Sequence, residues 1–109
     1  MKQSFIIPLI LLSSVLYAED LKNSEEYKIG VMVKAVAKAL KSPEKAGSLK
    51  VISEYGTDTR YYTMIRGWLV QELKGAESLL SVNKDKPRGK HFQQKVDFLK
   101  KAIRRIDLE

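Results

Sequence analysis

Helical spacing of apolar residues runs through the chain after its first eighteen residues, and it restricts the accessible folds more than any other feature. In the last such stretch the apolar residues recur every three or four positions, which places them on one side of an α-helix. They are Phe92, Val96, Leu99, Ile103 and Ile106. No stretch alternates apolar and polar residues with the period of two that a half-buried strand needs. We therefore predict an all-α protein, a small bundle of about four helices.

The first two helices have recognisable boundaries. Asn23 can cap the first helix, and Glu26 can return a hydrogen bond to the cap, so the helix is expected to begin at about residue 25. Ser42 and Pro43 then suit the cap and first position of a second helix. Gly56 is expected to end that helix in a left-handed conformation. The buried stripe of the first helix is predicted to contain Ile29, Val33, Val36 and Leu40.

The third and fourth helices are separated by one substantial loop. Thr57 or Asp58 is expected to cap the third helix, whose apolar residues keep one helical phase to about Ser81. A break at Gly75 is the alternative. Residues 82–91 (VNKDKPRGKH) are polar and contain proline and glycine, so they are predicted to form the loop. The fourth helix follows.

The N-terminal segment has the layout of a secretory signal. Residues 1–18 begin with a lysine, continue with the mostly apolar stretch Phe5–Leu16, and end at Ala18. That stretch is shorter than the roughly 20 apolar residues of a membrane-spanning helix, so no transmembrane helix is expected in the mature chain. Because Leu16 is not a small residue, an uncleaved N-terminal anchor is the alternative. We predict a signal peptide at 1–18 and one helical domain at 19–109, exported to the periplasm or the exterior.

Charge and cysteine usage limit the possible partners. The chain has no cysteine, which excludes disulfides and thiolate chemistry, and its net charge is +7. Basic residues are concentrated after residue 83, so a positive surface is expected there. In an exported protein such a surface suits an acidic envelope or secreted protein, or an anionic lipid, glycan or nucleic acid, with genomic DNA disfavoured. The candidate anion- or partner-binding residues are Lys84, Lys86, Arg88, Lys90, Lys100, Lys101, Arg104 and Arg105.

A possible cleft is predicted along the third helix. Glu72 falls at the edge of its apolar stripe. There a carboxylate either works as an acid or base in a cleft with Arg66 and Trp68, or, as we favour, forms an ion pair between helices or reaches out to water. The aromatic residues nearby suit a stacking surface or the core. Gly67 costs a helix about 1 kcal/mol relative to alanine, which close approach by another helix or a partner would explain.

No catalytic, metal or cofactor motif is present. His91 is the sole histidine and has no cysteine or second histidine to complete a metal site. Small periplasmic acid-stress chaperones are similar in size and helical character, but they rely on a cysteine pair that this chain lacks, so no residue role is transferred from them. We expect a non-enzymatic binding or accessory protein that needs no cofactor, with a homodimer possible. A hydrolase-type enzyme using Glu72 is the less favoured alternative.

Overall fold

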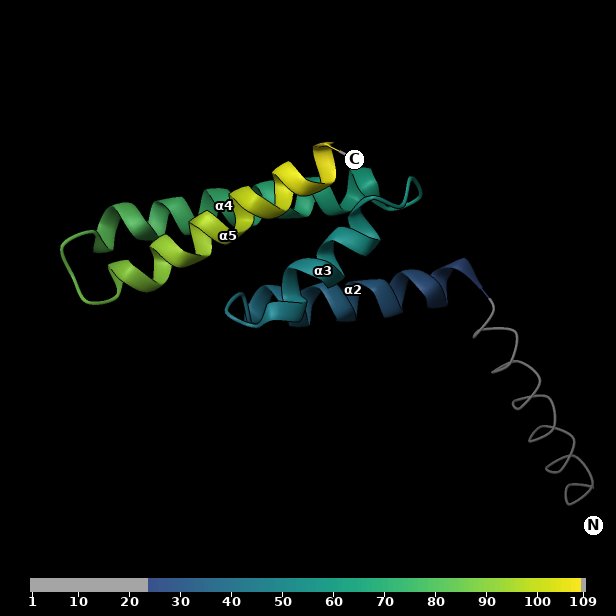
Figure 1. The fold of residues 1–109 in the computed structure, drawn as a ribbon, viewed down its shortest axis with the longest axis horizontal. Helices are drawn as coiled ribbons and strands as arrows, with labels where there is room; N and C mark the ends of the chain where they lie inside the picture. Colours follow the sequence, from purple (N-terminus) through teal and green to yellow (C-terminus); the bar gives the residue numbers. More distant parts are fainter. Residues whose placement is uncertain (1–23, 109) are drawn as a thin grey trace, which may run out of the picture. The chain divides into compact units, whose positions relative to one another are not determined.

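The computed structural model describes residues 24–108. The predicted signal segment 1–18, its cleavage point and the cap at Asn23 lie outside the described residues. Within these residues the protein is all-helical, as predicted, with four helices and no strand. The helices are α2 (Glu25–Lys41), α3 (Ala46–Gly56), α4 (Tyr62–Asn83) and α5 (Gly89–Leu108) (Figure 1). None of them is long and apolar enough to cross a membrane.

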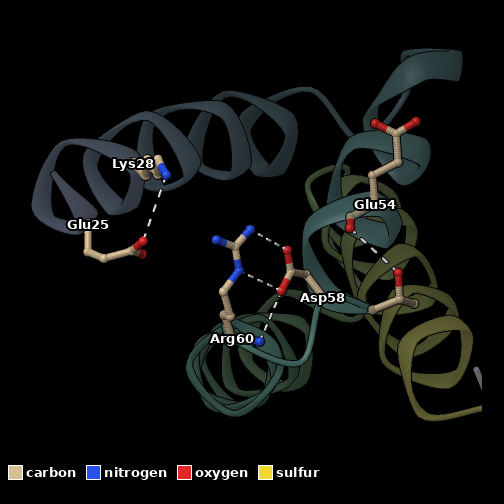
Figure 2. A network of polar contacts seen from close by, with 6 residues as sticks. Glu25, Lys28, Glu54, Asp58 and Arg60 are labelled. Carbon is tan, nitrogen blue, oxygen red and sulfur yellow. Dashed lines mark hydrogen bonds and ion pairs between the residues drawn. The ribbon is translucent and has the colours of Figure 1, made fainter. Parts of the chain in front are cut away.

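The chain divides into two compact units, and the first of them ends at Lys34. Its described part is the beginning of α2, where the hydroxyl of Ser24 accepts a hydrogen bond from the backbone N–H of Tyr27 at 3.1 Å. Glu25 pairs with Lys28 at 3.8 Å one turn along the helix (Figure 2). The helix begins where it was predicted, but Val33 is 38% exposed and the adjacent Met32 is buried. Val36 and Leu40 are buried as predicted, so the stripe keeps its face and the prediction was wrong for Val33 alone.

The second unit starts at Ala35, and its turn between α2 and α3 differs from the prediction. The second helix begins at Ala46, three residues after Pro43. The backbone N–H of Lys45 and the hydroxyl of Ser48 both donate to the carbonyl of Ser42, at 3.1 and 2.6 Å. Ser42 thus contributes its backbone carbonyl to this turn. The prediction that Ser42 caps the second helix was wrong. The N-cap position of α3 is Lys45, which makes no side-chain hydrogen bond to the helix.

Gly56 ends α3 for a reason that the sequence did not reveal. No glycine among the described residues has a positive φ, so the predicted left-handed stop was wrong. A Cβ atom at Gly56 would lie 2.5 Å from Cγ2 of Ile106, on α5. The position is therefore restricted to glycine by the packing of α3 against α5. The hydroxyl of Thr57 then donates to the carbonyl of Ser53 at 2.8 Å and closes the helix end.

The chain turns sharply between α3 and α4. Asp58 accepts hydrogen bonds from the backbone N–H of Arg60 at 3.0 Å and from its guanidinium at 2.9 and 3.1 Å (Figure 2). These contacts hold the pKa of Asp58 below its ordinary value. Asp58 was predicted to cap the third helix, but α4 begins four residues later, after Tyr61, with no side-chain cap.

Two mid-helix glycines leave α4 uninterrupted. The helix continues through Gly75 to Asn83, so the alternative of a break is excluded. At Gly67 and at Gly75 a Cβ atom would meet nothing within 4 Å. The close helix approach considered for Gly67 is therefore absent from the described chain.

The core of the second unit lies between α4 and α5, with α3 against both. α4 and α5 run side by side in opposite directions (Figure 1). Of the five apolar residues predicted for the last helix, Phe92 and Ile103 are half-buried and the other three are buried. Each fully buried aliphatic side chain contributes about 1.5–3 kcal/mol to folding. The buried residues of α3, α4 and α5 include Ile52, Ile65, Leu69, Ala76, Val96, Leu99, Ala102 and Ile106.

Candidate functional site

A surface cavity of about 340 Å³ lies between α4 and α5, along the second half of α5. We call it the α4–α5 groove. Its apolar wall is formed by Leu73 of α4 with Ile103 and Leu108 of α5. Its polar residues all belong to α5, where three- and four-residue spacing places them on one face. They are Lys100, Arg104 and Asp107.

The two cations of the groove are available to a partner. Lys100 and Arg104 are exposed, and neither forms an ion pair with any residue between 24 and 108. They stand one helical turn apart, a like-charge arrangement that costs an isolated helix a few tenths of a kcal/mol. An anionic group bound between them would relieve that repulsion.

Asp107, at the end of the groove, is already engaged with α4. Its carboxylate accepts a hydrogen bond from the hydroxyl of Tyr62 at 2.6 Å. Nε of Arg66 donates to Oδ1 at 2.9 Å, and Nη2 donates to Oδ2 at 3.2 Å. This contact joins the first two turns of α4 to the last turn of α5, and the guanidinium balances the carboxylate charge. The groove therefore keeps the positive charge of its two free cations.

The same contact shifts the pKa of all three groups. The Arg66 hydrogen bonds, followed by that of Tyr62, lower the pKa of Asp107 because they favour the ionised carboxylate. The carboxylate in turn raises the pKa of Arg66. It also raises the pKa of Tyr62, since the hydroxyl must keep its proton to donate. Asp107 is therefore ionised and Tyr62 neutral at physiological pH.

The predicted positive surface is divided into two clusters by the length of α5. Figure 1 shows the connection between α4 and α5 at one end of the helix pair. Lys84, Lys86, Arg88 and Lys90 belong to this connection and the first turn of α5, whereas the groove lies along the second half of α5. Ten residues of helix, about 15 Å, separate the last of these from Lys100. Within the second cluster, Lys100 and Arg104 line the groove, whereas Lys101 and Arg105 do not.

The residues predicted to form a cleft on the third helix are not brought together. Arg66 binds Asp107, while Glu72 pairs with Lys95 of α5 at 3.5 Å. The inter-helix ion pair, the favoured interpretation of Glu72, is thus the arrangement found. Trp68 is half-buried and lines none of the cavities described in this section.

The second unit contains two further cavities. One, of about 320 Å³, lies where α2 ends and α3 begins and is lined mainly by small residues, with two lysines. The other, of about 330 Å³, lies between the α2–α3 turn and α5 and includes His91 with Glu44 and Asp97. No cluster of metal-ligating side chains occurs among residues 24–108.

The sequence did not reveal the apolar half of the groove or the role of Asp107. Nothing in the sequence distinguishes Leu73, Ile103 and Leu108 from other apolar helix residues. The contact of Asp107 with Tyr62 joins residues 45 positions apart, so no local pattern indicates it. Only the antiparallel register of α4 and α5 brings these residues together. No protein-family model, curated protein or solved structure matches the chain.

Proposed function

We propose that this protein is an exported, non-enzymatic binding module whose α4–α5 groove holds an acidic segment of an envelope or secreted partner protein. The observation that carries the proposal is that one cavity combines an apolar wall with two cations that form no ion pair within residues 24–108. Apolar contact supplies affinity, and the cations select acidic partners.

The spacing of the cations suits an amphipathic helix. Lys100 and Arg104 are four residues apart, about 6 Å along α5. A partner helix with carboxylates one turn apart can face both cations while its apolar side chain rests against Leu73 and Ile103. Arg104 can bind a carboxylate with two parallel hydrogen bonds. The contact of Asp107 with α4 fixes the end of the groove beforehand, which reduces the ordering that binding requires.

The absence of catalysis is part of the proposal. General acid–base chemistry needs a titratable group positioned toward a substrate. Glu72 and Arg66 were the candidates, and each is held by an opposite charge on α5. Their arrangement supports a structural role for both.

The test compares two double variants of the full chain. Fluorescence anisotropy measures binding of a labelled helical peptide that carries glutamates at i and i+4 beside a leucine. Lys100→Gln/Arg104→Gln is expected to weaken binding by about tenfold or more, because hydrogen bonds to charged groups contribute about 1.5–3 kcal/mol.

Lys101→Gln/Arg105→Gln is the matched control. It removes the same two charges from the same turns of α5 but lies outside the groove. The control is expected to bind within about twofold of the parent. Equal losses in both variants, or none in either, would refute the groove as the binding site.

A further inference from the structure

We propose a second binding surface, at the connection between α4 and α5, that docks on an anionic lipid surface. We call it the hairpin tip. It combines the exposed apolar side chains at the end of α4 with the basic residues that follow. It consists of Leu79, Val82, Lys84, Lys86, Arg88 and Lys90.

The apolar part of the hairpin tip is unusually exposed. Val82 is 69% exposed and Leu79 is 48% exposed. Their three-residue spacing makes them neighbours on the last turns of α4. Both are therefore free to insert into a lipid surface without any rearrangement of the core.

The charge of the hairpin tip is complementary to anionic lipid. All four basic residues are exposed, and none is in an ion pair with another residue of the described chain. Asp85 is the sole acidic residue between Leu79 and Lys90, so this stretch carries +3. Each cation near an anionic membrane strengthens binding about fivefold, and the effect weakens with salt.

Backbone hydrogen bonds hold the hairpin tip in shape. The N–H of Lys86 donates to the carbonyl of Asn83, and the N–H of Gly89 donates to that of Lys86, both at 2.9 Å. A Cβ atom at Gly89 would lie 2.5 Å from the carbonyl oxygen of Asn83, so α5 begins in direct contact with the end of α4. The four cations are thus carried on an ordered connection, and little conformational freedom is lost on docking.

Lipid fits the hairpin tip better than a soluble polyanion does. A glycan or nucleic acid would satisfy the cations but would give Val82 and Leu79 no hydrocarbon to enter. An anionic bilayer offers phosphate groups and acyl chains within one interface, which suits adjacent basic and apolar side chains. This surface lies at the far end of α5 from the α4–α5 groove, so either proposal can fail without the other.

The first experiment is sedimentation of the full chain with phosphatidylcholine vesicles that contain or lack phosphatidylglycerol. The tip variant is Lys84→Gln/Lys86→Gln/Arg88→Gln/Lys90→Gln. It is expected to lose at least about tenfold in affinity for the anionic vesicles. The control, Lys41→Gln/Lys74→Gln/Lys101→Gln/Arg105→Gln, removes the same number of exposed charges outside both the hairpin tip and the α4–α5 groove and is expected to stay within about twofold of the parent. The N-terminal segment is common to all three proteins, so its own contribution cancels.

The second experiment tests insertion. Val82→Ser is expected to weaken binding to anionic vesicles several-fold while leaving heparin binding unchanged. In Val82→Trp, fluorescence should shift to shorter wavelength on binding and be quenched by brominated acyl chains. A tip variant that binds like the parent, or a control that loses as much, would overturn the proposal. If Val82→Ser binds vesicles like the parent while the tip variant loses heparin and vesicles equally, the site binds soluble polyanions and the lipid proposal is wrong.

Discussion

At the scale of single residues, Asp107 shows how an exposed carboxylate becomes part of the structure. It receives hydrogen bonds from Tyr62 and Arg66, two residues one turn apart on α4. Exposed ion pairs usually contribute little, but this one has a guanidinium bound in bidentate geometry and a third partner. The sequence suggested Arg66 as a cleft residue and gave no indication of Asp107, because their proximity depends on the pairing of two helices.

The pH dependence of stability follows from the lowered pKa of Asp107. The folded protein favours the carboxylate, so this contribution is present above the unfolded-state pKa of about 3.9 and is lost as pH falls through the lower folded-state pKa. Asp107→Asn is expected to be less stable than the parent at neutral pH and to approach it in acid. Urea unfolding at neutral and acidic pH, followed by circular dichroism, measures the difference. A constant difference across that range would contradict an ionic origin.

At the scale of helices, periodicity predicted more than local caps did. The continuous phase of α4 and the apolar series of α5 are features of many residues, and the structure retains both. The starts of α3 and α4 were misplaced because Ser42 and Asp58 had other hydrogen-bonding options. One contributes its carbonyl to a turn, and the other binds the next arginine. A capping residue read from sequence competes with such alternatives, and tertiary packing decides among them.

Glycine substitutions separate packing from helix propensity. Gly56→Ala places a methyl group against the buried side chain of Ile106 and is expected to destabilise the protein by about 1–3 kcal/mol. Gly67→Ala enters open space and is expected to stabilise it by about 0.5–1 kcal/mol. Urea denaturation measures whether each substitution lowers or raises the free energy of unfolding. Equal effects would mean that contact between α3 and α5 does not restrict residue 56.

At the scale of the whole molecule, both proposed binding surfaces depend on which charges lie together. The sequence suggested that eight of the basic residues after residue 83 form one surface. The structure gives two, because four of these cations lie at or just after the connection between α4 and α5 and the other four lie in the second half of α5. One cluster borders an apolar groove, and the other follows exposed apolar residues of α4. Composition predicts that the surface is positive, but the fold determines that its basic residues form two separate clusters.

Export of the protein is a prediction with a direct readout. Residues 1–18 have the order of charged, apolar and small residues that is typical of a signal peptide, although Leu16 departs from the usual cleavage pattern. Intact mass measurement of protein recovered outside the cytoplasm should show a chain that begins at Glu19. Recovery with Met1 retained would favour the uncleaved anchor, and recovery only from the cytoplasm would contradict export altogether.

The close contact between Ile106 and Gly56 has a consequence for when the core can fold during synthesis. α5 follows the other helices in the chain, and it supplies the side chains that cover α3 and α4. Because translation proceeds from the N-terminus, the earlier helices emerge before their partner exists. Their apolar faces remain open during that interval, which gives chaperones time to hold the nascent polypeptide. Closure of this core then waits until α5 has been translated.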